Sequence, residues 1–154
     1  MLINRENAAV FCQNLKKNGK IVFTNGCFDI IHAGHVRYLT AAKNFGDILI
    51  VGLNTDDSVR RLKGNSRPIN NQNDRAEVLL GLKAVDYVIL FGENTAEALI
   101  SEIKPDIYVK GGDYILETLP EAKIVQSYGG RVEFVNLVAG RSTTNVIKKI
   151  LAEK

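Results

Sequence analysis

Short apolar segments of strand length alternate along this chain with segments that carry helical patterns. Five apolar runs are expected to form strands: residues 20–24, 47–53, 87–91, 106–110 and 132–136. Runs that are apolar almost throughout, rather than at every second residue, are typical of strands covered on both faces. Helices between consecutive strands then join them by right-handed crossovers and cover a parallel sheet on both sides. The pattern therefore predicts a doubly wound, five-stranded α/β fold.

The segments between these strands carry signals for helices. Helices are expected over residues 4–17, 36–43, 74–82, 95–103 and 120–128, with a short one opened by Thr55-Asp56-Asp57 and a last one from about residue 143. Thr95 is expected to cap the start of the helix that follows it. A chain of 154 residues with 45% hydrophobic content suits one globular domain. Residues 1–154 are therefore expected to form a single domain, with the N-terminal helix preceding its core.

Composition excludes several classes of protein. No apolar run approaches the roughly 18 residues that a membrane-spanning helix needs, and the N-terminus does not resemble a secretory signal. Cys12 and Cys27 are too few for a disulfide framework or a zinc site, which fits a reducing cytoplasm. The net charge of +3 is mild and dispersed, so it does not indicate nucleic-acid binding. A cytoplasmic location, with neither a membrane nor a nucleic acid as partner, is expected.

Both histidines of the chain lie in one tetrapeptide, His32-Ala33-Gly34-His35, after the first predicted strand and at the start of a helix. Imidazole groups donate hydrogen bonds to phosphoryl oxygens, and a helix N-terminus adds unpaired N–H groups and a positive dipole. A glycine between the two histidines lets a ligand approach the backbone. The tetrapeptide therefore predicts a compact site for a phosphorylated ligand.

Other polar segments are expected beside the histidines. In a doubly wound sheet, ligands bind beyond the carboxyl ends of the strands, where the strand order reverses. Residues 25–35, 54–57, 110–113 and 140–144 all follow predicted strands, so they are expected to converge at one rim. The common phosphate loops and the nucleophile elbow are absent from the sequence. Histidines, cations and helix N-termini suit the binding and polarising of a polyphosphate, because transfer at phosphorus depends mainly on positioning and charge neutralisation.

Two motifs in this chain resemble the signatures of the cytidylyltransferase-like nucleotidyltransferases. Residues 26–35 (GCFDIIHAGH) resemble the first signature, and residues 141–145 (RSTTN) resemble the second, which opens the last helix of the family. The resemblance extends from about residue 20 to residue 150. It implies a Rossmann-like nucleotidyltransferase fold, in which the two histidines bind the triphosphate and stabilise the transition state at the α-phosphorus.

Within the family, residues 62–68, 109–114 and 142–150 resemble the adenylyltransferases of heptose 1-phosphate metabolism. This resemblance implies transfer of AMP from ATP to D-glycero-β-D-manno-heptose 1-phosphate, giving ADP-heptose for lipopolysaccharide synthesis and pyrophosphate, with Mg²⁺ carried by the nucleotide. Similar proteins are often oligomers, so a homo-oligomer, with a dimer favoured, is expected. In many bacteria this domain follows a sugar kinase. Only about 19 residues precede the first strand here, so a stand-alone transferase supplied by a separate kinase is expected.

The resemblance and the motifs together assign roles to individual residues. His32, His35 and Lys63 are expected to be catalytic, with Lys63 reaching in from a mobile loop. The expected nucleotide-binding residues are Thr24, Gly26, Cys27, Phe28, Gly34, Lys110, Gly111, Asp113, Arg141, Ser142, Thr143 and Thr144. Asp29, Arg67 and Arg75 are expected to bind the substrate. Asp29 also suits the positioning of Mg²⁺ or of a local turn, and Arg75 also suits a solvated surface. No cluster of metal ligands is predicted.

Two other functions fit the same fold. One is a cytidylyltransferase that uses CTP and glycerol 3-phosphate or a related polyol phosphate. The other is a nucleotide-binding module without catalytic activity, because doubly wound domains host many functions. The histidine pair and Lys63 favour an enzyme, since these groups suit a transition state more than a ground state.

Overall fold

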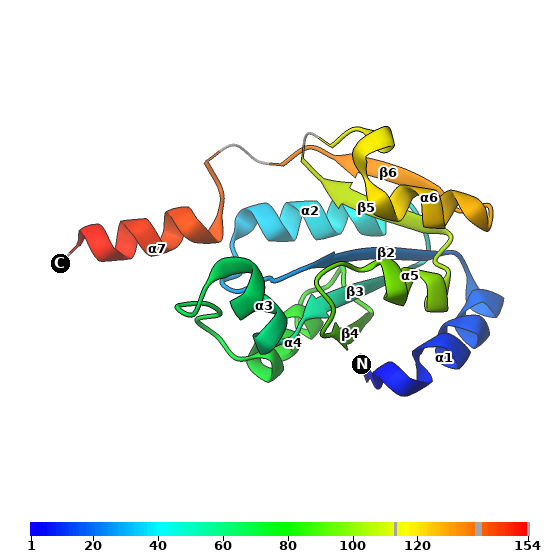
Figure 1. The fold of residues 1–154 in the computed structure, drawn as a ribbon, viewed down its shortest axis with the longest axis horizontal. Coiled ribbons are helices and arrows are strands. Elements are labelled where there is room, and N and C mark those ends of the chain that lie inside the picture. Colours follow the sequence, from blue (N-terminus) through cyan, green and yellow to red (C-terminus); the bar gives the residue numbers. More distant parts are fainter. Residues whose placement is uncertain (113, 138–139, 154) are drawn as a thin grey trace.

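The computed structural model describes residues 1–112, 114–137 and 140–153. They contain a parallel sheet of six strands in the order β1-β4-β3-β2-β5-β6 (Figure 1). The strands are β1 (Leu2–Ile3), β2 (Ile21–Gly26), β3 (Ile48–Asn54), β4 (Tyr87–Phe91), β5 (Ile107–Gly111) and β6 (Arg131–Val135). The five predicted strands are β2 to β6. The prediction missed β1, which pairs with β4 at the sheet edge and is too short to show an apolar run.

The described part of the chain contains seven α-helices. They are α1 (Ala8–Leu15), α2 (Ala33–Lys43), α3 (Asp56–Lys63), α4 (Gln72–Leu80), α5 (Glu97–Ile103), α6 (Pro120–Ser127) and α7 (Thr143–Ala152). The helix predicted over residues 4–17 is shorter, because 3-10 turns at Arg5–Asn7 and Lys16–Asn18 flank α1. The prediction that Thr95 caps α5 is wrong: Ala96 is the N-cap residue, and the Thr95 hydroxyl instead donates to the Glu97 carboxylate.

The two faces of the sheet bury two separate apolar clusters. Alternate residues of a strand point to opposite faces, so Phe23 packs on one side of β2 and Val22 on the other. The cluster that contains Phe23 includes residues of α1, α5 and α6. The cluster that contains Val22 includes residues of α2 and α4. Helices α5 and α6 therefore cover one face of the sheet, and α2 covers the opposite face.

The strand order reverses at β2, which lies between β3 and β5. Because the sheet is parallel, the carboxyl ends of these three strands lie at one edge, which is the usual place for a ligand in such folds. Helix α7 extends away from the body of the molecule from this edge, and none of its residues is buried (Figure 1). Among the described residues, no helix has both the length and the apolarity needed to cross a membrane.

Candidate active site

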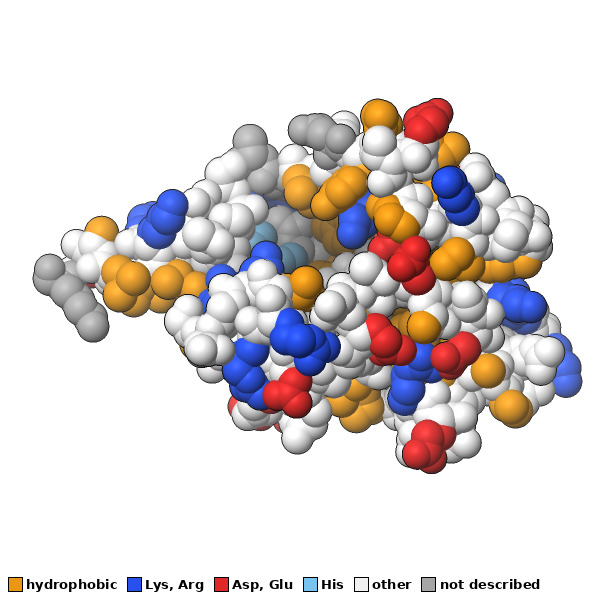
Figure 2. Space-filling view, in the orientation of Figure 1, with side chains coloured by type: hydrophobic (Ala, Val, Ile, Leu, Met, Phe, Trp, Pro, Cys, Tyr) orange, Lys and Arg blue, Asp and Glu red, His pale blue; other side chains and the backbone are white. Residues whose placement is uncertain are grey.

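A cleft of about 680 Å³ opens at the carboxyl ends of β2, β3 and β5. Figure 2 shows the two histidine side chains inside this hollow, with lysine and arginine side chains around it. The four segments predicted to converge all contribute to the lining, through residues 25–29, His32, Gly34, His35, Asn54, Lys110, Gly111 and residues 141–144. The expected rim is therefore confirmed, although its segments lie far apart in the sequence.

His32 and His35 cap the N-terminal end of α2 reciprocally. The backbone N–H of Gly34 donates to His32 Nδ1 (3.1 Å), and the backbone N–H of His32 donates to His35 Nδ1 (3.3 Å). The two rings stack with their centroids 3.9 Å apart. Because each Nδ1 accepts a hydrogen bond, each neutral imidazole carries its proton on Nε2. Both side chains line the cleft, so these two Nε2–H groups are the donors that remain for a ligand.

The surroundings of the histidines keep them neutral. Burial lowers the pKa of His32, and the positive charge of Arg141 lowers it further. Burial and the neighbouring His32 lower the pKa of His35 to about 4. At neutral pH the pair therefore donates hydrogen bonds as two uncharged imidazoles. This arrangement suits the polarising of phosphoryl oxygens and leaves no proton in place for acid catalysis.

The backbone around the histidines brings separate segments close together. A Cβ at Gly34 would lie 2.8 Å from Cε1 of His32 and 3.0 Å from Cβ of Arg141, so only glycine fits between α2 and the segment before α7. Phe28 adopts a left-handed conformation with φ of 44°, and its ring packs against Gly26 and His35. These close contacts turn the chain sharply between β2 and α2. The backbone of residues 26–28 consequently lines the cleft.

The first turn of α7 lies against the loop that carries the histidines. The Thr143 hydroxyl donates to the carbonyl oxygen of Ile30 (3.0 Å), and the Ser142 hydroxyl accepts from the backbone N–H of Asn145 (3.0 Å). Ser142, Thr143 and Thr144 all line the cleft. The N-termini of α2 and α7 therefore contribute to the same cleft, and each offers backbone N–H groups and a positive dipole to an anion.

Four cationic side chains line the cleft: Lys63, Arg67, Lys110 and Arg141. Lys63 was expected to lie in a loop, but it is the last residue of α3. Nζ of Lys110 lies 5.0 Å from the centre of the Tyr114 ring. The cations come from different elements, so together they give the cleft the positive potential that a polyphosphate requires. Asp113, expected to bind nucleotide, lies outside the described residues.

Asp29 holds the loop after α3. Its carboxylate accepts hydrogen bonds from the backbone N–H groups of Ile69 (2.8 Å) and Asn70 (2.9 Å) and from Nε of Arg67 (2.7 Å). The Asp29 side chain is fully buried, and these hydrogen bonds, together with the Arg67 charge, lower the pKa of its carboxyl group against the effect of burial. The interpretation of Asp29 as a residue that positions a local turn is therefore confirmed, whereas its contact with the substrate stays a prediction. Asp29 also positions Arg67, and both residues line the cleft.

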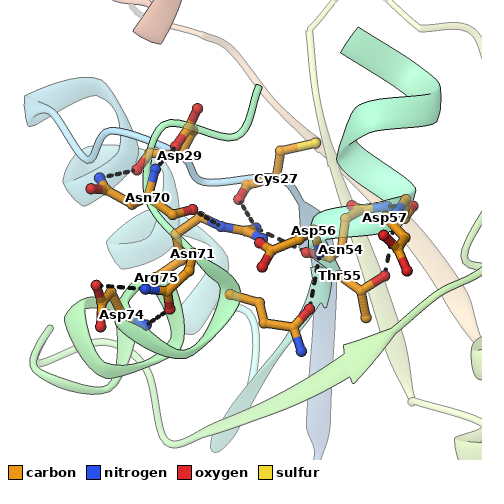
Figure 3. A network of polar contacts seen from close by, with 12 residues as sticks. Cys27, Asp29, Asn54, Thr55, Asp56, Asp57, Asn70, Asn71, Asp74 and Arg75 are labelled. Atoms are coloured by element: carbon orange, nitrogen blue, oxygen red, sulfur yellow. Dashed lines mark hydrogen bonds and ion pairs between the residues drawn. The ribbon is translucent and has the colours of Figure 1, made fainter. Parts of the chain in front are cut away.

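Arg75 is likewise a buried structural residue and not a substrate ligand. Figure 3 shows its guanidinium group among segments from three parts of the chain. It donates to the carbonyl oxygens of Cys27 (2.7 Å), Asn54 (2.9 Å) and Asn70 (2.9 Å) and pairs with the carboxylate of Asp56 (2.8 Å). The side chain has no exposed area and does not line the cleft, so both earlier interpretations, a phosphate ligand and a surface charge, are wrong.

Thr24 is also outside the lining of the cleft. Its hydroxyl lies 2.6 Å from the hydroxyl of Tyr38, which donates to the carbonyl oxygen of Val109. Since the Tyr38 proton is used in that bond, Thr24 donates to Tyr38. Thr24 is buried, and its side chain positions Tyr38 instead of lining the cleft. Tyr38 itself lines the cleft.

The cleft also contains polar residues to which the sequence gave no role. They are Asn25, Asn54, Asn94, Thr95 and Glu121. Asn25 and Asn54 belong to the carboxyl ends of strands, so the rule that placed the rim there also points to them. Glu121 lies in the first turn of a helix, where an acidic residue is common, so no pattern distinguishes it.

The described residues provide little for a metal ion by themselves. No three of their His, Cys, Asp or Glu side chains come together as a set of ligands. The Asp29 carboxylate is already used by three N–H donors. A divalent ion in this cleft would therefore be held mainly by the phosphates of a bound nucleotide, a mode of binding that suits Mg²⁺.

Known proteins are similar to this chain in sequence and in fold. The profile of the family described as cytidylyltransferase-like matches residues 23–149. The "Bifunctional protein HldE" of Syntrophotalea carbinolica is 55% identical over 137 residues, which are 88% of this chain and 28% of that protein. The protein of the same name from Pelobacter propionicus is 52% identical over 149 residues, which are 96% of this chain and 30% of that protein. The chain thus spans less than a third of the length of these relatives.

Two solved structures resemble the fold. The lipopolysaccharide core biosynthesis protein from Thermoplasma volcanium GSS1 matches with a TM-score of 0.62 and 33% identity, over 78% of this chain and 97% of that one. The pantoate-beta-alanine ligase from Francisella tularensis matches with a TM-score of 0.60 over all of this chain and 80% of that one. Its identity is only 14%, so this second likeness concerns the fold alone.

The low pKa of His35 predicts a pH dependence of stability. In the unfolded chain a histidine takes up a proton near pH 6.5, whereas folded His35 does so only near pH 4. Between these values the unfolded state binds more protons, so the free energy of unfolding is expected to fall as the pH is lowered from about 6.5 to about 4. Urea denaturation across this range measures the slope. His35→Gln keeps an acceptor for the cap but cannot titrate, so its slope is expected to be shallower. Equal slopes for the two proteins would contradict the assignment.

The buried position of Arg75 predicts a large effect on stability. Arg75→Met leaves three carbonyl groups and the Asp56 carboxylate without their donor, and is expected to lower the free energy of unfolding by about 3–5 kcal/mol. Arg60→Met removes an exposed arginine that pairs with Asp57 on α3. This variant is expected to change the free energy of unfolding by less than about 1 kcal/mol. Urea denaturation followed by circular dichroism compares the two. Similar losses for both variants would show that Arg75 does not hold these segments together.

Proposed function

The chain belongs to the cytidylyltransferase-like family, and from this premise we propose that it transfers AMP from ATP to D-glycero-β-D-manno-heptose 1-phosphate, releasing pyrophosphate. The observation that carries the proposal is the stacked histidine pair, whose two Nε2–H groups remain for a ligand beside the N-termini of α2 and α7. The choice of substrates rests on the resemblance to the adenylyltransferases of heptose 1-phosphate metabolism. The name of the Thermoplasma volcanium protein, which refers to lipopolysaccharide core biosynthesis, supports the same choice.

In the proposed reaction, an oxygen of the sugar phosphate attacks the α-phosphorus of ATP in line. The bond between the α-phosphorus and the bridging oxygen breaks, and pyrophosphate leaves with the bonding electrons. Nε2 of His32 and Nε2 of His35 donate to oxygens of the α-phosphoryl group and of the leaving side. The backbone N–H groups of Cys27 and Phe28 hold the α-phosphate. These donors are in place before the reaction, so they stabilise charge as it develops.

The first turn of α7 holds the β- and γ-phosphates in this proposal. The Thr143 hydroxyl has given its only proton to Ile30, so Thr143 contributes through its backbone N–H. No described residue forms a hydrogen bond with the Thr144 hydroxyl, so this group supplies a side-chain donor as well. Arg141 adds positive charge next to His32. Lys63 and Arg67 neutralise the phosphate of the acceptor, and Asp29 sets the direction of Arg67.

Other parts of the proposal follow the family resemblance. Nucleotidyltransferases generally use a divalent metal ion together with the nucleotide, and we propose Mg²⁺ held by the phosphates. A homodimer and a cytoplasmic location stay predictions. The family profile and the relatives at 52% and 55% identity do not favour a CTP-dependent polyol-phosphate enzyme or a non-catalytic nucleotide-binding module. The relatives are called bifunctional, and this chain corresponds to less than a third of their length, so it would carry one of two activities.

The choice of substrates can be tested by pyrophosphate release in the presence of Mg²⁺. ATP and CTP are crossed with the two anomers of heptose 1-phosphate and with glycerol 3-phosphate. We expect turnover only with ATP and the β-anomer. Turnover with CTP and glycerol 3-phosphate would instead assign the chain to the polyol-phosphate branch. Tight nucleotide binding without turnover of any pair would indicate a binding module.

The role of the histidine pair can be tested by His35→Ala. Loss of one donor to the reacting phosphoryl group is expected to lower kcat about 100- to 1000-fold, as for other single donors to a developing negative charge. Arg37→Ala changes an exposed residue of the same helix, two positions further on, and is expected to leave kcat unchanged. Steady-state kinetics with ATP and heptose 1-phosphate measure both variants. A kcat for His35→Ala within about threefold of the wild type would exclude this role.

A further inference from the structure

Glu121 is a buried acidic side chain in the cleft that the proposed reaction leaves without a task. It lies in the first turn of α6, only 6% of it is exposed, and it contributes to the lining of the cleft. No described residue donates a hydrogen bond to its carboxylate or forms an ion pair with it. The other acidic residue of the lining, Asp29, is fully engaged with three N–H donors. Glu121 therefore brings to the cleft a carboxylate that no described residue satisfies.

A free carboxylate is unfavourable in a cleft that receives polyphosphate. Its charge repels phosphate oxygens, whereas a ligand group that donates hydrogen bonds to it is attracted. Phosphate oxygens that are ionised have no proton to donate, whereas the hydroxyl groups of a sugar have several. The chemistry of Glu121 thus indicates a neutral, hydroxyl-bearing part of a ligand.

The residues around Glu121 fit the same kind of ligand. Burial raises the pKa of the Tyr108 hydroxyl, and the nearby negative charge of Glu121 raises it further. That hydroxyl donates to Oδ1 of Asn25 (2.7 Å), which leaves the amide nitrogen of Asn25 as a donor. Glu121 and Asn25 therefore combine a charged acceptor with a neutral donor in one part of the lining. Such a combination is typical of sites that bind sugar hydroxyls.

The part of the lining that contains Glu121, called the Glu121 wall below, extends toward α5. Helices α5 and α6 pack together, and both follow strands of one parallel sheet, so both begin at its carboxyl edge. Asn94 and Thr95, just before α5, line the cleft at the same edge as Glu121. Nε of Arg61 donates to Oδ1 of Asn94 (3.0 Å), so the amide nitrogen of Asn94 is the group that remains for a ligand. Asn94 and Thr95 thus add neutral polar groups, and Glu121 adds an acidic one, to a lining that also contains four cations.

The geometry of in-line displacement indicates whether the hydroxyl groups of the acceptor or those of the ribose of ATP reach the Glu121 wall. Pyrophosphate leaves toward the N-terminus of α7, which lies against the loop before α2. Helices α5 and α6 cover the opposite face of the sheet from α2. An acceptor that attacks opposite the leaving group therefore approaches from the side of α5 and α6. This favours the hydroxyl groups of the acceptor over those of the ribose of ATP.

We propose that Glu121 binds hydroxyl groups of the acceptor sugar and thereby selects a polyhydroxylated sugar phosphate over smaller phosphates. The proposal rests on the proposed function, because it assumes that the acceptor is a sugar phosphate. Asn25 and Asn94 supply hydrogen-bond donors to the same sugar. The cations hold its phosphate at the other end.

The test compares Glu121→Gln with Glu117→Gln. Glu117 is exposed, four residues before Glu121, so it provides the same chemical change outside the cleft. KM for heptose 1-phosphate is measured at saturating ATP, and the Kd of ATP with Mg²⁺ is measured directly by calorimetry. Glu121→Gln is expected to raise KM for the sugar phosphate about 10- to 100-fold, the usual range for a hydrogen bond to a charged group. The Kd of ATP, and both constants of Glu117→Gln, are expected to stay at the wild-type values.

Monodeoxy analogues of the sugar phosphate add a second measurement. The wild type is expected to lose kcat/KM with the analogue that lacks the hydroxyl bound by Glu121. In Glu121→Gln the loss of kcat/KM with that analogue is expected to be smaller, because the substitution has already weakened the hydrogen bond to this hydroxyl group. A purely structural role of Glu121 would give the same loss with every analogue and would overturn the proposal.

Other outcomes also decide the matter. If Glu121→Gln binds both substrates more tightly, the carboxylate only repels phosphates and the proposal is wrong. If only the Kd of ATP rises, the carboxylate binds the ribose and the proposal is again wrong. If the wild type turns over no sugar 1-phosphate although it binds ATP, the proposed function fails and this inference fails with it. Turnover by the wild type with an unchanged KM in Glu121→Gln overturns the inference alone.

Discussion

The buried guanidinium group of Arg75 is the interaction on which the geometry of the cleft depends. It joins the carbonyl oxygens of Cys27, Asn54 and Asn70, which lie 48, 21 and 5 residues away in the sequence. These three residues belong to the turn after β2, the end of β3 and the loop after α3. A single planar group with several donors can hold three backbone segments at once, which a lysine cannot do. The shape of the cleft therefore depends on a cation that does not line it.

The histidine tetrapeptide shows how local structure prepares chemistry. Capping α2 consumes Nδ1 of both rings, and this use leaves both protons on Nε2. Burial keeps the pair uncharged, so the donors are present at neutral pH without a prior ionisation step. The same two hydrogen bonds thus stabilise the helix and set the tautomers. A residue that replaced either histidine would have to satisfy both requirements.

Sequence patterns predicted the sheet well because each buried strand is an apolar run that is visible without knowledge of its neighbours. The edge strand β1 was missed because two residues carry no periodicity. The rim was predicted because parallel strands bring their carboxyl ends together. A turn-holding role was among the roles predicted for Asp29, whereas the structural roles of Thr24 and Arg75 were not predicted. Each of those three side chains faces a partner brought by tertiary folding, so the residue type alone did not reveal whether it faced solvent, ligand or protein.

The lining of the cleft combines two kinds of polar group. Cations and helix N-termini offer donors to the phosphates, while Glu121 and the asparagines offer an acceptor and amide donors to neutral hydroxyl groups. In the proposed reaction, a sugar phosphate would meet both kinds of group, with its phosphate bound by donors and its hydroxyl groups bound by Glu121 and the asparagines. Selection of the acceptor and its alignment for attack would then be one physical requirement, because a phosphate without hydroxyl groups would give the Glu121 carboxylate no hydrogen-bond donor.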